Sequence, residues 1–241
     1  MTFCIAIQVR QGFLALADTE IVKREERVTR SKLSFVPNDN QTWWLMTSGL
    51  VSIRDEVVRY PYQDLSNKAN RDQKLFELAN RFRNPLRRVR KENDGESLSM
   101  SGLAFKMHAI LNGQLLGDPQ PKLFYVYPEG NWIEAGPDSL YFIAGGTQYA
   151  KPILDRLLTS RTSLRYAASL ASLSFDMTRT SVHNVDFPID FLVRDKDRRE
   201  TRQHRYLRLD LEKVFSWWND TLCQELDHFP SENFAELFLD R

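Results

Sequence analysis

A threonine stands directly behind the initiator methionine, in the opening Met1-Thr2-Phe3-Cys4. A methionyl aminopeptidase removes a first methionine readily when the next side chain is small, so Thr2 can become the N-terminal residue. Its free α-amine would titrate near ~7.7–8 and could take the proton of its own hydroxyl, which is a known route to an activated nucleophile. Taken alone, Thr2 is more simply a small residue after methionine. The hypothesis therefore depends on the groups that accompany it.

Three residues further along have the types that such a nucleophile needs: a carboxylate, a cation and a backbone donor for an oxyanion. Asp18 ends the second strand of a hairpin, and antiparallel strands joined by a short turn bring their far ends together. Lys32 is a candidate cation, and Gly49 is a candidate N–H donor at the entry to a helix. Each has a plain alternative as a strand-end acid, a surface lysine or a turn glycine. Their joint order along the chain favours a site.

Hydrophobic periodicity predicts the elements that position these residues. Strands are expected at 3–9, 13–17, 34–36, 42–47, 102–111, 122–127, 132–135, 141–144, 189–193 and 201–209. Helices are expected around 50–58 and at 73–91, 148–159, 163–176 and 211–226. Pro85 could kink or divide the second helix, and Asn112-Gly113 is a strong hairpin-turn signal. Blocks of strands separated by helix pairs predict a layered α+β sandwich, with one domain over 1–241.

Composition narrows the functional classes. The 33 Lys and Arg residues balance 32 Asp and Glu residues, which gives no overall attraction to nucleic acid or to an anionic membrane. The sequence has neither a metal-ligand motif, nor a signal peptide, nor an apolar run of the ~20 residues that cross a bilayer. Cys4 and Cys223 fit a reducing compartment. We therefore expect a soluble cytoplasmic protein with no cofactor, no bound metal, no nucleic-acid partner and no membrane association.

Considered together, these residues resemble the N-terminal-nucleophile peptidases of the proteasome family, which includes proteasome β-subunits and bacterial HslV. The similarity is greatest to the bacterial group known as Anbu, the proposed ancestral β-subunit, and covers most of the chain. The segments that carry it are Met1-Thr2-Phe3-Cys4, Ala17-Asp18, Thr47-Ser48-Gly49, residues 127–135, residues 149–156, Asp176 and Pro188-Ile189-Asp190.

The resemblance implies a four-layer αββα sandwich with an active site at the mouth between two sheets. By that resemblance, Thr2 is the nucleophile, and its α-amine is the general base, directly or through a water. Asp18 would orient the site, Lys32 would lower the pKa of the hydroxyl, and Gly49 would supply the oxyanion N–H. An acyl-enzyme ester at Thr2 would then be cleaved by water.

Asp176, with Ser181 or Thr178, matches the supporting Asp and Ser that the family places beside the N-terminal amine. The chain also departs from the family pattern. The segment 19–23 replaces a Ser-Arg-like pair, and the short stretch before Lys32 makes Lys23 a weaker rival for the lysine role. Gly145 stands where proteasomal β-subunits have a supporting serine. A weak or lost activity is therefore one of the alternatives.

The resemblance also implies that subunits assemble into a homo-oligomeric ring or open spiral and act on peptides or unfolded polypeptides. The paired Trp217-Trp218 could be a contact surface, although one of them could equally be a core residue. A basic helix face (Arg81, Arg83, Arg87, Arg88, Arg90 and Lys91) is interpreted as a solvated face or a subunit contact. Whether an ATPase feeds such an assembly stays open. The alternatives to a peptidase are a non-catalytic scaffold or binding subunit and, third, a small-amide amidohydrolase.

Overall fold

A computed structural model describes residues 2–23, 26–38, 41–49, 54–58, 74–93, 107–197 and 200–237. The chain divides into two compact units, Met1–Tyr206 and Leu207–Arg241, and the fold of the first unit positions the candidate site. Parts of the predicted elements at 50–58 and 102–111 lie outside the described residues. That the whole chain forms one domain stays a prediction.

The first of two five-stranded antiparallel sheets contains the opening hairpin. Its strands, in spatial order, are β10 (Tyr141–Gly145), β1 (Phe3–Val9), β2 (Gly12–Asp18), β11 (Ile189–Asp195) and β12 (Thr201–Tyr206). Every residue of β2 and all but one of β1 are buried, because both faces of this sheet are covered. Cys4 lies opposite Ala17, so the register brings Asp18 to the start of β1 as predicted.

The second sheet is an antiparallel meander of five strands. In order these are β5 (Leu33–Asn38), β6 (Gln41–Ser48), β7 (His108–Gln114), β8 (Lys122–Val126) and β9 (Trp132–Glu134). A separate hairpin of β3 (Glu20–Lys23) and β4 (Glu26–Thr29) connects the two sheets along the chain.

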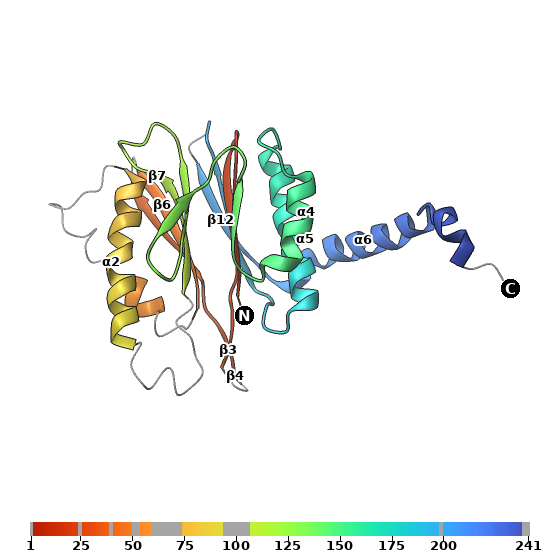
Figure 1. Cartoon of the computed structure of the whole chain (residues 1–241), viewed down its shortest axis with the longest axis horizontal. Helices are drawn as coiled ribbons and strands as arrows, with labels where there is room; N and C mark the ends of the chain where they lie inside the picture. The colour runs from red at the N-terminus through yellow and green to blue at the C-terminus, as the bar shows by residue number, and fades with distance from the viewer. Residues whose placement is uncertain are drawn as a thin grey trace. The chain divides into compact units, whose positions relative to one another are not determined.

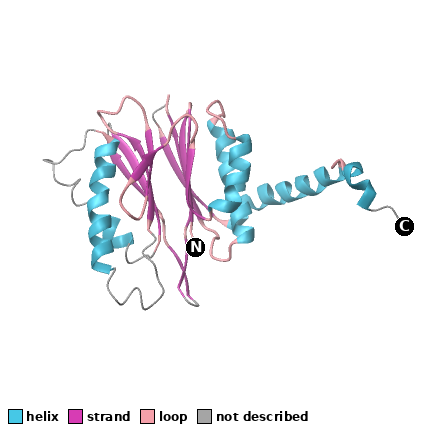
Figure 2. Cartoon of the chain, viewed as in Figure 1, coloured by secondary structure: helices cyan, strands magenta, loops and turns pink. Residues whose placement is uncertain are grey.

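Helices cover the outer face of each sheet (Figures 1 and 2). Helix α2 (Leu75–Asn93) packs on the second sheet, and helices α4 (Thr147–Leu157) and α5 (Leu164–Ser181) pack on the first. Between the sheets lies an apolar cluster to which both contribute, including Cys4, Ala15, Trp44 and Ile110. The predicted four-layer αββα sandwich of the α+β class is confirmed.

Helix α2 runs through Pro85 without a break from Leu75 to Asn93, so the predicted division does not occur. A proline inside a helix removes one backbone hydrogen bond and costs ~3 kcal/mol. The apolar side chains before and after it, among them Leu78, Phe82, Leu86 and Val89, are all at most 3% exposed on one face. Their packing on the second sheet outweighs that loss.

The hairpin turn predicted at Asn112-Gly113 is wrong. Strand β7 continues through both residues, and Asn112 is fully buried opposite Trp44. A Cβ on Gly113 would lie 2.4 Å from the Thr42 carbonyl oxygen, so glycine is needed here for the close approach of β6. The chain turns instead at 115–118, where the Asp118 carboxylate accepts the Leu115 N–H at 3.0 Å.

The second unit consists of helix α6 (Arg208–Asp227) and a 3-10 helix η1 (Ser231–Leu237). Only Phe215 of α6 is buried, whereas Trp217 is 59% exposed and Trp218 is partly buried. Helix α6 starts three residues before its predicted start, and α5 extends five residues beyond its predicted end. Within the described part of the chain, no helix has the length and apolar character needed to cross a membrane.

Candidate active site

Strand β1 determines which way Thr2 faces. Side chains alternate between the two faces of a strand. Phe3 packs against Phe175 of α5 with ring centroids 6.1 Å apart, whereas Cys4 belongs to the cluster between the sheets. The same alternation places Thr2 on the side of Cys4, at the mouth between the sheets. Thr2 is partly buried, and its hydroxyl makes no hydrogen bond to any described residue.

The backbone of Thr2 is held by two glycines at the end of β10. Gly146 donates its N–H to the Thr2 carbonyl oxygen at 3.0 Å, and Gly145 lies opposite Phe3 in the sheet. Gly145 has a φ of +111°, and a Cβ there would lie 1.6 Å from the Thr2 carbonyl oxygen. The serine of proteasomal β-subunits therefore cannot occupy this position without displacing Thr2.

The carboxylate of Asp18 is fully buried immediately behind Thr2. One oxygen accepts the Phe3 N–H at 2.8 Å, and the other accepts the Lys32 ammonium at 2.5 Å. Burial raises the pKa of Asp18 to about 6, against the opposing effects of the Lys32 charge and of both hydrogen bonds. Because this pKa still lies below 7, the carboxylate is mostly ionised at neutral pH. Its hydrogen bond from the Phe3 N–H anchors the residue that follows Thr2.

Lys32 is the lysine that reaches this carboxylate, and it is only 5% exposed. Its Nζ also donates to the Glu20 carbonyl oxygen at 2.9 Å, and its own carbonyl oxygen accepts the Thr47 N–H at 3.2 Å. Lys23, the weaker rival, lies at the other end of β3 from Glu20, opposite Glu26 in the β3–β4 hairpin. The structure thus joins Asp18 to Lys32.

Gly49 follows β6 at the same end of the sandwich. Its neighbour Ser48 pairs with His108 at the start of β7, and Gly49 itself is exposed with a φ of +129°. That backbone conformation favours glycine. The exposed position leaves this residue accessible at the mouth.

Asp176 has a different partner from the one that the resemblance implies. Its carboxylate lies 2.6 Å from the Arg179 guanidinium, one helical turn along α5, and Arg179 also lies over the Phe187 ring. Burial raises the pKa of Asp176, and the Arg179 charge opposes that rise. Thr178 is buried and donates its hydroxyl to the Ser174 carbonyl oxygen at 2.8 Å, while Ser181 is exposed at the helix end.

The methyl group of Thr178 nevertheless packs close to the residue that holds the Thr2 backbone. Its Cγ2 would be 2.7 Å from a Cβ on Gly146, the residue that binds the Thr2 carbonyl oxygen. The helix therefore supports Thr2 through packing here, and neither candidate hydroxyl hydrogen-bonds to Asp176 among the described residues.

Three further groups near the mouth were not predicted from the sequence. Cys4 lies with its sulfur 4.0 Å from the Thr47 carbonyl oxygen, and burial raises the pKa of its thiol strongly, which makes it a poor nucleophile. Arg54 is 6% exposed and pairs with Asp55. His108 Nδ1 is 2.9 Å from the Tyr125 hydroxyl. A histidine and a tyrosine on separate strands carry no spacing signal that could have revealed this pair.

Metal ligands do not gather in the part of the chain that is described. No group of three or more His, Cys, Asp or Glu side chains there is arranged to hold a metal ion. A hydroxyl, a buried carboxylate and a buried ammonium group lie together at the mouth.

Comparisons with known proteins place this fold in a class. No protein-family model and no curated protein matches the chain. Solved structures do. Anbu from Yersinia bercovieri, described as an ancestral β-subunit, matches with a TM-score of 0.86 and 25% identity, covering 95% of this chain and 98% of that one.

Two other Anbu structures match to a similar extent. The helical assembly of the Anbu complex from Pseudomonas aeruginosa gives a TM-score of 0.87 at 25% identity, over 95% of this chain and 98% of the other. An Anbu mutant from Hyphomicrobium sp. strain MC1 gives a TM-score of 0.84 at 27% identity, over 94% of this chain and 97% of the other.

The fold is therefore that of a proteasome-like N-terminal-nucleophile hydrolase. Within that class the chain is similar to Anbu over most of its length, and the resemblance predicted from the sequence is confirmed.

Proposed function

We propose that the chain is a proteasome-like threonine peptidase subunit whose nucleophile is Thr2, exposed by removal of Met1. The observation that carries this proposal is the double engagement of Asp18. Its carboxylate binds both the Phe3 N–H and the Lys32 ammonium directly behind Thr2, at 2.8 and 2.5 Å. A buried cation at this place favours the ionised form of a neighbouring hydroxyl.

The reaction follows from these groups. The α-amine of Thr2 takes the hydroxyl proton, directly or through a water, while the hydroxyl oxygen attacks a peptide carbonyl. The N–H of Gly49 stabilises the developing oxyanion. The amine then gives the proton to the leaving nitrogen as the peptide bond breaks, and water hydrolyses the ester. In this proposal Asp176 supports the amine, with Ser181 or Thr178 as an auxiliary hydroxyl.

Self-assembly is the second part of the proposal. The solved helical assembly of the Anbu complex from Pseudomonas aeruginosa supports homo-oligomerisation of this similar chain. Peptides or unfolded polypeptides would be the substrates. We also propose a cytoplasmic location, which is supported by the two free cysteines, Cys4 buried and Cys223 exposed.

Intact mass and covalent labelling test the catalytic part. The purified chain should have lost Met1, and incubation with an epoxyketone or β-lactone should add one probe per subunit. Thr2→Ser should keep the adduct and Thr2→Ala should lose it. Retained Met1, or labelling that persists in Thr2→Ala, contradicts a Thr2 nucleophile.

A non-catalytic scaffold of the same fold is the second candidate. Two observations favour it: Gly145 excludes the family's serine, and Asp176 pairs with Arg179 rather than with a hydroxyl. A chain that has lost Met1 and assembles, yet never reacts with either probe at high concentration, would favour the scaffold.

A further inference from the structure

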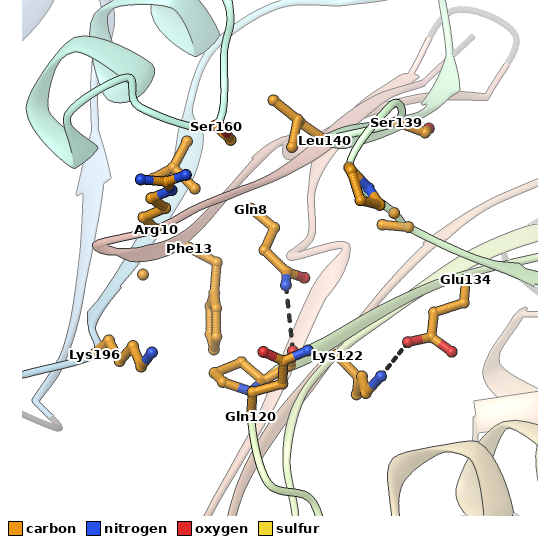
Figure 3. A pocket seen from close by; sticks show the side chains of 16 residues that line it. Gln8, Arg10, Phe13, Gln120, Lys122, Glu134, Ser139, Leu140, Ser160 and Lys196 are labelled. Atoms are coloured by element: carbon orange, nitrogen blue, oxygen red, sulfur yellow. Dashed lines mark hydrogen bonds and ion pairs between the residues drawn. The ribbon is translucent and has the colours of Figure 1, made fainter.

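A cavity of about 650 Å³ lies at the end of the sandwich where β1 turns into β2 (Figure 3). Its walls come from this turn, from residues 120–122 and 134–140, and from Ser160 and Lys196. Strand β1 separates it from Thr2 by roughly 20 Å, at ~3.3 Å per residue. The volume lies within the ~300–1,000 Å³ typical of small-molecule sites. The cavity is therefore distinct from the candidate active site.

The charged side chains that line this cavity are mostly cationic. Arg10, Lys122 and Lys196 face one carboxylate, that of Glu134, which is ion-paired with Lys122. Two positive charges therefore remain in excess. Figure 3 shows Arg10 and Lys196 on one side of the cavity beside Phe13, and the Lys122–Glu134 pair on the other. Neither Arg10 nor Lys196 forms an ion pair with a residue of the described ranges.

Gln8 adds an unused hydrogen-bond acceptor. Its side chain points into the cavity and donates from Nε2 to the Pro121 carbonyl oxygen at 3.3 Å. That oxygen can only accept, so the orientation of the Gln8 amide is fixed. The other amide atom, Oε1, is buried and has no hydrogen-bond partner among the residues that the structure describes. Buried polar atoms are nearly always satisfied, so a ligand donor that reaches this atom after a small shift of the Gln8 side chain would be stabilised.

We infer that this cavity binds a small organic anion that also carries a hydrogen-bond donor. Its carboxylate or phosphate lies between Arg10 and Lys196, where charge-assisted hydrogen bonds are strongest. Its hydroxyl or amine donates to Gln8 Oε1, and its carbon skeleton lies against the partly exposed Leu140, which lines the same cavity. This site is additional to the peptidase proposal and does not require it.

Isothermal titration calorimetry with the full chain tests this inference with four probes: succinate, malate, glycerol 3-phosphate and inorganic phosphate. Malate differs from succinate by one hydroxyl, so it should bind more tightly, and Gln8→Leu should abolish the difference. Arg10→Gln and Lys196→Gln should each weaken binding about tenfold or more. Whether malate or glycerol 3-phosphate binds more tightly identifies carboxylate or phosphate as the preferred anion.

Lys91→Gln is the matched control, because it removes one positive charge from an exposed position on α2. It should leave the affinities unchanged, as should Thr2→Ala, which separates this site from the proposed nucleophile. Circular dichroism verifies that each variant is folded. If Arg10→Gln does not fold, Lys196→Gln alone tests whether the cationic side chains bind the anion. The inference is overturned if no probe gives saturable heat below about 10 mM, or if Lys91→Gln weakens binding as much as Arg10→Gln.

Discussion

Lys32 Nζ lies 2.5 Å from Asp18 Oδ2, and the two side chains are 5% and 0% exposed. Two charges withdrawn from water to this degree are costly unless each compensates the other. The pair also forms hydrogen bonds with the backbone: Asp18 accepts the N–H of Phe3, and Lys32 donates to the carbonyl oxygen of Glu20. The same contact therefore joins the start of β1 to the segment before β5.

Removal of the cation of this pair should destabilise the fold strongly. Lys32→Met should lower the free energy of unfolding by about 3–5 kcal/mol, because it leaves the Asp18 carboxylate buried without its cation. Asp18→Asn, which mimics the neutral carboxyl that the raised pKa favours, should cost much less, and the double variant should lose less than Lys32→Met alone because no buried carboxylate is left unpaired. Urea denaturation at pH 7 and fixed protein concentration measures all three. Lys91→Met, an exposed control, should change by less than about 0.5 kcal/mol. Additive losses would contradict the coupling.

The raised pKa of Asp18 predicts a pH dependence with a definite sign. The pKa is 3.8 in the unfolded chain and about 6 in the folded one. Between these values the native state holds a proton that the unfolded state has released, so this group's contribution to stability falls as pH rises through that window. The unfolding free energy of the wild type, minus that of Asp18→Asn, should decrease from pH 4 to pH 6 and then level off. A difference that is constant or increases would refute the assignment.

How far the sequence predicts this site depends on the range of the interactions involved. Alternation along two short strands was enough to place Asp18 behind Thr2, because a hairpin is local. The turn at Asn112-Gly113 failed because the buried approach of β6 to Gly113 overrides a local turn preference. The Asp176–Arg179 pair was missed because helix α5 continues beyond its predicted end at residue 176.

Gly145 provides a test of how tightly the nucleophile's backbone is held. Gly145→Ser restores the residue type of proteasomal β-subunits, yet it should destabilise the chain by at least about 2 kcal/mol. Both the φ of +111° and the approach of 1.6 Å to the Thr2 carbonyl oxygen oppose a side chain. Gly136→Ser, where a Cβ meets nothing within 4 Å, is the matched control and should be nearly neutral. Denaturation curves compare the two, and a stable Gly145→Ser variant would be evidence against this packing.

Two of the contacts of Arg179, an ion pair and a ring contact, can be separated by pH. Arg179→Gln removes both the ion pair with Asp176 and the interaction with the Phe187 ring. The contribution of the ion pair to the free energy of unfolding should be present at pH 7. It should decrease at low pH, where Asp176 is protonated and no longer attracts the Arg179 cation. We expect a loss of roughly 1 kcal/mol at pH 7 and a smaller one at pH 4. Arg165→Gln, at an exposed position of the same helix, should show no such dependence. An equal loss at both pH values would assign the effect of Arg179→Gln to contacts other than the ion pair.

Helix α6 has an apolar stripe that self-assembly would cover. Leu211, Phe215, Trp218, Leu222 and Leu226 recur at three- and four-residue spacing on one helix face. Within this unit Leu222 is 46% exposed and Leu226 is 69% exposed. Exposed apolar stripes of this kind typically mark protein contacts, and the partner that the oligomer proposal provides is a second copy of the chain.

Leu222→Glu should therefore shift the protein to smaller species in native mass spectrometry at micromolar concentration, because it places a charge in that contact. Ser216→Glu adds the same charge at an exposed position of α6 outside this stripe and should leave the assembly intact. If both variants assemble as the wild type does, the stripe is not the contact. A wild-type chain that is strictly monomeric under these conditions would instead contradict the oligomer proposal itself, so the two failures are distinguishable.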